Sequence, residues 1–112
     1  KWPLDGEIVE DFDLKKSKKG IRVKNISSSQ IKPAAPGNVV YAGSGLRGYG
    51  NLVIIKHSDN MLSAYANNKE IIVEVGQSVS QNDAISRLDK NQIIYFEIRR
   101  DGSPVDPLRY LK

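Results

Sequence analysis

Apolar and polar residues alternate with a period of two along most of this 112-residue chain, which limits the fold more than any other feature. That period places successive side chains on opposite faces of a β-strand, whereas an α-helix needs a period near 3.6. No stretch of a dozen residues has the helical period, and the best helical candidate is a single turn near 67–70. The predicted strands are 6–12, 20–24, 37–43, 51–57, 61–66, 71–75 and 93–99.

Turn-forming residues separate these predicted strands. Gly, Pro, Asn and Asp gather at 35–37, 48–51, 75–77, 81–83 and 101–104, and the turn Ser58-Asp59-Asn60 lets two strands pair as a hairpin. Four consecutive apolar residues in 51–57 indicate a central strand buried on both faces. The pattern predicts an all-β fold with little or no helix, forming one domain over 1–112. Its tail, 104–111, should be extended and pack back on the sheet.

Composition excludes several classes of protein. The chain has no cysteine, so thiolate zinc sites, thiol nucleophiles and disulfides are ruled out. The net charge of +4 is modest, and the one basic cluster, Lys15 to Lys19 around Ser17, is typical of a solvated turn, so we predict no nucleic-acid partner. No apolar run approaches the roughly 18–20 residues that cross a bilayer, so we predict no membrane contact by this domain.

Several motifs, in order along nearly the whole chain, resemble those of the LytM (lysostaphin-type) zinc metallopeptidase domain. They lie at 37–43, 48–57, 62–66, 73–79, 96–99 and 104–108. The resemblance implies an antiparallel sheet with a groove. Active members cut peptide bridges of the bacterial cell wall with a zinc ion that has three protein ligands and an open position for water.

The ligand positions of that family can be placed on this sequence, and none keeps its ligand. The histidine and aspartate of the first motif, His-x-Gly-x-Asp, fall on Lys18 and Arg22, and the middle-strand histidine falls on Asn67. The two histidines of His-x-His fall on Ile93 and Tyr95. Because two replacements are cations that repel Zn²⁺, the resemblance implies a domain with no metal, no cofactor and no enzymatic activity.

One histidine, His57, remains at the end of a predicted strand. A single histidine cannot build a site with three ligands, so we interpret His57 as a residue that satisfies its own hydrogen bonds. An active metalloenzyme with unusual ligands is the competing hypothesis, and only the fold supports it.

A groove without metal can still bind a protein. We expect eight residues to line the former active site, four of them turned toward it by the geometry of the family, and tyrosine and arginine among them are favoured at protein-binding hot spots. The predicted groove residues are Lys19, Arg22, Tyr49, Leu52, Tyr65, Asn67, Tyr95 and Arg99. Two alternatives stay open: Tyr65 and Tyr95 as core tyrosines, and Arg99 paired with Glu97 or Asp101 on an exposed face.

Within the family, the chain is most similar to the metal-free domains of the NlpD/EnvC amidase-activator group, and 46–52 and 107–111 resemble the NlpD branch more. This resemblance implies a non-catalytic activator of a periplasmic zinc amidase, an N-acetylmuramoyl-L-alanine amidase of the AmiC-like type, in septal peptidoglycan splitting and daughter-cell separation. It implies the C-terminal domain of a longer periplasmic protein, tethered to the outer membrane by a lipid anchor upstream of Lys1. The alternative is a module that binds peptidoglycan in the old cleft.

Overall fold

The computed structural model describes residues 2–111, and it confirms the predicted all-β class. Lys1 and Lys112, the ends of the predicted domain, lie outside the described residues. The elements are β1 (Gly6–Glu10), η1 (Leu14–Lys16), β2 (Ile21–Asn25), β3 (Gln30–Ile31), β4 (Gly37–Gly43), β5 (Leu52–Lys56), β6 (Met61–Ala66), β7 (Glu70–Ile71), β8 (Ser78–Val79), β9 (Ser86–Arg87), β10 (Ile93–Arg100), β11 (Ser103–Val105) and η2 (Pro107–Arg109), where η marks a three-residue 3₁₀ turn.

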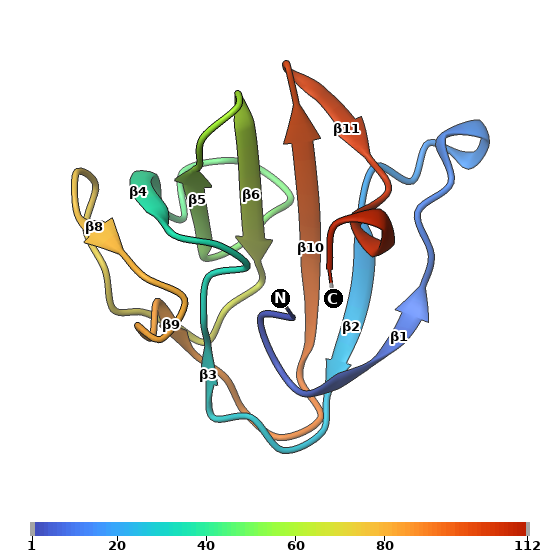
Figure 1. The fold of residues 1–112 in the computed structure, drawn as a ribbon. Helices are drawn as coiled ribbons and strands as arrows, with labels where there is room; N and C mark the ends of the chain where they lie inside the picture. Colours follow the sequence, from blue (N-terminus) through green and yellow to red (C-terminus); the bar gives the residue numbers. More distant parts are fainter. Residues whose placement is uncertain (1, 112) are drawn as a thin grey trace.

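Two antiparallel sheets contain all these strands. The larger sheet has the order β1-β2-β10-β6-β5-β4-β8, with β11 paired to β10, and the smaller has the order β3-β9-β7. β10 lies in the middle of the larger sheet between β6 and β2 (Figure 1). The predicted hairpin is confirmed: β5 pairs with β6, and Asp59 and Asn60 both have φ of +58° in the turn, a conformation that Asn and Asp tolerate.

The alternation read from the sequence separates the larger sheet into two faces. On β10, Ile94, Phe96 and Ile98 are buried in the core, so Tyr95 and Arg99 point to the opposite face. The same parity holds on β2, which pairs with β10 on one side, and on β6 and β5, which follow β10 on the other side. The core includes Ile21, Val23, Ile31, Val39, Val53, Ile55, Tyr65, Val79, Ile85, Ile94, Phe96 and Ile98. We call the other side of the sheet the groove face.

The predicted strand over 71–75 is wrong beyond its first residue. Only Glu70–Ile71 pairs as β7, because the chain turns at Gly76, whose φ is +93°. The Gln77 backbone N–H donates to the Glu74 carbonyl across that turn at 3.2 Å, and the Gly76 N–H donates to Val39 on β4 at 2.8 Å. The turn therefore leads the chain to β8 at the edge of the larger sheet instead of extending β7.

Helical turns lie elsewhere than predicted. Asn67 has φ of +67°, in the left-handed region, so 67–70 cannot form a right-handed turn. Turns occur instead where Asp13 caps η1 and Asp106 caps η2, each accepting a backbone N–H at 3.1 Å. The tail is thus extended only to Val105, although buried Leu111 confirms that it packs back on the sheet. Within residues 2–111, no helix has the length and apolar character that crossing a bilayer requires.

Candidate functional site

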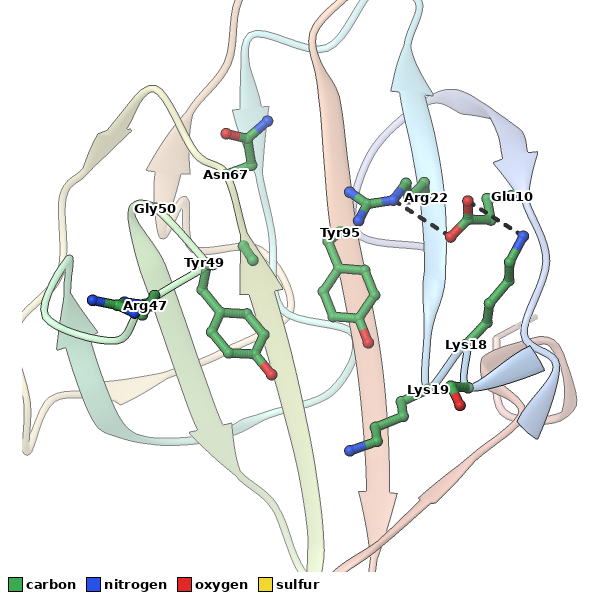
Figure 2. A pocket seen from close by; sticks show the side chains of 12 residues that line it. Glu10, Lys18, Lys19, Arg22, Arg47, Tyr49, Gly50, Asn67 and Tyr95 are labelled. Atoms are coloured by element: carbon green, nitrogen blue, oxygen red, sulfur yellow. Dashed lines mark ion pairs between the residues drawn. The ribbon is translucent and has the colours of Figure 1, made fainter. Parts of the chain in front are cut away.

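A cavity of about 620 Å³ opens on the groove face (Figure 2). Its lining comes from the end of β1, the segment after η1, β2, the loop before β5, the end of β6 and β10. We call it the basic cavity. The residues that line it are Glu10, Ser17, Lys18, Lys19, Arg22, Arg47, Gly48, Tyr49, Gly50, Ala66, Asn67 and Tyr95.

The basic cavity gathers most of the positions at which the LytM resemblance places metal ligands. Lys18, Arg22, Asn67 and Tyr95 all line it. Ile93 does not, but its carbonyl accepts a hydrogen bond of 2.7 Å from the Asn67 side-chain amide. Residues from four separate segments therefore meet at one place, as the resemblance implies. Among residues 2–111, no group of three or more His, Cys, Asp or Glu side chains could hold a metal ion.

Close packing of two segments sets the position of the basic side chains. A Cβ at Gly20 would clash with the Phe96 carbonyl and the Tyr95 ring, so only glycine lets this segment approach β10 so closely. This approach places Lys18, Lys19 and Arg22 in the lining of the same cavity as Tyr95. On the far side, Gly48 and Gly50 have φ of +89° and +61°, and the loop is anchored where the Asn67 N–H donates to the Tyr49 carbonyl at 2.9 Å.

Positive charge dominates the basic cavity. Glu10 is the one carboxylate among the described lining residues, and it forms ion pairs of 3.5 Å with Lys18 and 3.4 Å with Arg22. In the described part of the chain, Lys19 and Arg47 form no ion pair with an acidic residue. Four cations against one carboxylate give the cavity a net positive charge that favours an anionic ligand.

Tyr95 is held in place at the centre of the groove face. Its ring centroid lies 6.2 Å from that of Tyr49, and the Arg22 guanidinium carbon lies 5.4 Å from the Tyr95 centroid. The Tyr95 hydroxyl donates to Glu97 at 2.6 Å. Burial raises the pKa of Tyr95, and the hydrogen bond to the Glu97 carboxylate raises that pKa further, so the phenol remains a donor.

Arg99 pairs with Glu97, one of the two partners that the alternative for this residue named. Its Nε donates to Glu97, and this hydrogen bond raises the pKa of Arg99. However, Glu97 is only 5% exposed, so the pair does not lie on an exposed face as that alternative supposed. Arg99 and Tyr95 together satisfy a buried carboxylate, which would otherwise be costly to keep charged.

A second cavity of about 170 Å³ continues the groove face beyond Tyr49, which lines both cavities. We call it the apolar cavity, because Leu52, Ile54 and Leu62 are among its lining residues and its one charged pair is Glu97–Arg99. The complete lining is Leu46, Tyr49, Leu52, Ile54, Leu62, Ala64, Glu97 and Arg99.

The structure places seven of the eight predicted groove residues at these cavities. The basic cavity includes Lys19, Arg22, Tyr49, Asn67 and Tyr95, and the apolar cavity includes Tyr49, Leu52 and Arg99. Sequence reasoning missed Arg47, Leu46, Ile54 and Leu62 as lining residues. For Ile54 the signal was available, since it has the same parity as Leu52 on β5.

The prediction is wrong for the eighth groove residue, Tyr65. Its side chain is fully buried, and its ring centroid lies 5.3 Å from that of Phe96. The register explains this position, because Tyr65 pairs with Phe96 and Val53, both core residues. Cross-strand partners share a face, so Tyr65 belongs to the core and the alternative of a core tyrosine is correct for it.

Tyr65 ends a chain of hydrogen bonds that includes the only histidine. His57 Nδ1 lies 2.7 Å from the Pro36 carbonyl, which can only accept, so Nδ1 donates there, and Nε2 forms a hydrogen bond of 2.7 Å with Ser63 Oγ. Ser63 Oγ in turn is hydrogen-bonded to the Tyr65 hydroxyl at 2.6 Å, and that hydroxyl accepts from the Ala34 N–H at 2.9 Å. The interpretation of His57 as a self-satisfied residue is confirmed. Burial raises the pKa of Tyr65 to about 12.

Comparison with known proteins agrees with this architecture. Residues 16–107 match the model of peptidase family M23, so the chain belongs to this family, and the LytM-type resemblance is confirmed. A crystal structure of a putative M23 peptidase from Pseudomonas aeruginosa has a TM-score of 0.84 over 99% of this chain and 49% of that chain. At 20% identity, that likeness establishes the fold alone.

Two curated relatives are much more similar in sequence. Outer membrane antigenic lipoprotein B of Haemophilus influenzae is 44% identical over 115 residues, which cover 98% of this chain and 28% of that protein. Murein hydrolase activator NlpD of Escherichia coli strain K12 is 42% identical over 116 residues, which cover 99% of this chain and 31% of that protein. The chain thus spans about a third of the length of these relatives.

Proposed function

We propose that this domain is a non-catalytic activator of a periplasmic N-acetylmuramoyl-L-alanine amidase in septal peptidoglycan splitting and daughter-cell separation. It acts by protein–protein binding in the groove. One observation carries the proposal: an M23 fold keeps its groove, and that groove is lined by Lys18, Arg22, Asn67 and Tyr95, which the LytM resemblance places at the metal-ligand positions. The name of the E. coli relative, a murein hydrolase activator, supports the same conclusion.

The residues in the basic cavity do not fit a zinc ion. Zinc needs imidazole, thiolate or carboxylate ligands, usually three from the protein at a catalytic site. Glu10 is the one candidate among the described lining residues, and it is already paired with Lys18 and Arg22. His57 does not line the basic cavity and uses both ring nitrogens in the hydrogen-bond chain. We therefore derive no hydrolytic step for this domain.

Activation by binding requires that the groove prefer one state of the amidase. The domain draws an inhibitory segment off the amidase active site only if it binds the open amidase more tightly than the closed one. Reversing a population from about 1:99 to 99:1 takes a preference of roughly 10⁴-fold, or about 5.5 kcal/mol. A groove face with fixed aromatic rings such as Tyr49 and Tyr95 and an apolar cavity can contribute part of that energy.

The proposed partner is an AmiC-like amidase, and the proposed location is the periplasm, with a lipid anchor in the longer protein as the tether to the outer membrane. The name of the H. influenzae relative, an outer membrane lipoprotein, supports this location. A second candidate function is a peptidoglycan-binding module, which the positive charge of the basic cavity favours because stem peptides carry carboxylates.

An activation assay tests the proposal. The purified domain is mixed with an amidase of the source organism and dye-labelled sacculi, and dye release is measured. We expect strong stimulation by the wild-type domain and at least about tenfold less by Tyr95→Ala, as for a hot-spot residue. Lys32→Glu, which changes an exposed lysine outside both cavities, is the control and should stimulate normally.

Two results would contradict the proposed function. One is the absence of stimulation with every amidase of the organism. The other is dye release by the domain alone, accompanied by stoichiometric zinc in metal analysis. Binding of the domain to purified sacculi without any amidase effect would instead favour the peptidoglycan-binding module.

A further inference from the structure

The groove face offers two adjoining cavities of opposite chemistry. Tyr49 lines both, and Tyr95 and Arg99, which line the basic and the apolar cavity respectively, are four residues apart on β10. At about 3.3 Å per residue, Tyr95 and Arg99 lie roughly 13 Å apart along the strand. A single short segment of a partner can therefore occupy both.

The basic cavity favours a carboxylate. Lys19 and Arg47 have no acidic partner among the described residues, so a ligand does not need to displace an ion pair to reach them. Figure 2 shows Lys19 extended toward the side of the cavity that Tyr49 occupies. The Tyr49 hydroxyl forms no hydrogen bond within residues 2–111, which leaves it able to donate to an anion.

The apolar cavity favours a large aliphatic or aromatic side chain. Its volume of about 170 Å³ is similar to that of an apolar cavity of about 150 Å³ that holds one benzene molecule. Leu46, at the rim, is 45% exposed, so a bound apolar side chain would also remove this residue from water. The one charged pair, Glu97–Arg99, is internally neutralised and does not call for a charged ligand.

We infer that the groove selects a protein segment with two anchors, an Asp or Glu side chain in the basic cavity and a large apolar side chain in the apolar cavity. This inference rests on the proposed function and names the chemistry of the partner that the groove recognises. A protein segment fits better than peptidoglycan, because stem peptides offer carboxylates and methyl groups but no large apolar side chain for the second cavity.

Peptide selection tests the inference directly. The probe is a random library of nine-residue peptides displayed on phage and selected against the purified chain in low-salt buffer. We expect enriched sequences to contain Asp or Glu at a constant spacing from Leu, Ile, Met or Phe. Added salt should weaken binding of the enriched peptides, since exposed charges are screened. A library that yields no enriched sequence, or sequences without an acidic residue, overturns the inference.

Matched variants assign each anchor to its cavity. The double variant Lys19→Glu with Arg47→Glu should bind the enriched peptide at least about tenfold more weakly, because two attractions become repulsions. Leu46→Lys, at an exposed rim position, should abolish the preference for the apolar anchor and keep that for the acid. Lys32→Glu should change neither preference. Equal binding by all these variants contradicts the two-anchor groove.

The same variants separate this inference from the proposed function. If the wild-type domain stimulates the amidase and both the double variant and Leu46→Lys stimulate it equally well, the function stands and the inference fails. If the peptide preferences appear but no amidase responds, the inference stands and the proposed function fails. Binding to sacculi that depends on Lys19 and Arg47 but not on Leu46 overturns the inference in favour of a peptidoglycan ligand.

Discussion

Tyr65 and Tyr95 lie on adjacent strands of one sheet and have opposite roles. Tyr65, on β6, packs against Phe96 and is hydrogen-bonded to Ser63 inside the core. Tyr95, on β10, lies against Tyr49 and Arg22 and lines the basic cavity. Both rings are tyrosines, both hydroxyls are hydrogen-bonded and burial raises both pKa values, so residue type alone does not distinguish them.

The register between β6 and β10 makes the difference. Tyr95 pairs with Ala66, whereas Tyr65 pairs with Phe96, so the two tyrosines are offset by one residue in the strand register. In a sheet with one core face, a shift of one residue moves a side chain to the other side. The groove face is therefore free to change its residue types for recognition, while the core face preserves the fold.

The largest expected effect comes from truncating the core tyrosine. Tyr65→Ala should lower the free energy of unfolding by about 3–5 kcal/mol, because it leaves a cavity in the core and removes a hydrogen-bonding partner of Ser63. Tyr95→Ala should cost about 1–2 kcal/mol, since the ring is only half-buried. Urea unfolding followed by circular dichroism measures both. Equal losses would contradict the assignment of the two faces.

The second-largest effect should be a loss of folding stability at alkaline pH, caused by ionisation of Tyr65 in the core. The unfolded chain loses the Tyr65 proton near pH 10, whereas the folded chain keeps it to about pH 12, so the unfolded state binds fewer protons in that window. The stabilisation is complete below pH 10 and is lost as the pH rises through 12, about 2–3 kcal/mol in all. Unfolding measured across this range should depend less on pH in Tyr65→Phe. An unchanged pH dependence would show that Tyr65 is not the group responsible.

The third prediction concerns the buried carboxylate of Glu97, which lies between the two cavities. Arg99→Ala should destabilise the fold by about 2 kcal/mol, because Glu97 loses its ion pair while it remains buried. Adding Glu97→Gln should recover part of that loss, since an amide needs no counter-charge. Thermal unfolding of the single and double variants measures this coupling, and additive losses would show that the pair is not coupled.

The smallest effect on stability should come from a substitution in the basic cavity. Lys19→Glu changes an exposed side chain without an ion pair among the described residues, so the free energy of unfolding should change by less than about 0.5 kcal/mol. The same variant should lower amidase stimulation severalfold. Stimulation and chemical denaturation are measured on one preparation, and a loss of stability as large as that of Arg99→Ala would mean that Lys19 is structural.

Period-two alternation was enough to predict the principal strands. β2, β4, β6 and β10 follow predicted runs because each has one core face that fixes its pattern, whereas β5 follows the run of four consecutive apolar residues. Two-residue strands such as β8 and β9 were not predictable, because each exists only where a distant segment pairs with it. Near Asn67 the local composition suggested a helical turn, but Asn67 has a positive φ and its side chain donates one hydrogen bond to the Ile93 carbonyl.

For the site, motif order located most residues, while the face of each residue depended on register. The sequence placed Lys18, Arg22, Asn67 and Tyr95 at one site, and the structure brings them together. It also placed Tyr65 there, since nothing within β6 reveals that its cross-strand partner is Phe96. Arg47 and Leu46 lie on a loop, where alternation gives no information about direction.

The most direct test of the claim that the groove face recognises a partner is amidase stimulation by the double variant Lys19→Glu with Arg47→Glu. We expect this variant to unfold at the wild-type temperature and to release at least about tenfold less dye from labelled sacculi. Lys32→Glu should match the wild type in both measurements. Full stimulation by the folded double variant would contradict recognition of the partner by the basic cavity.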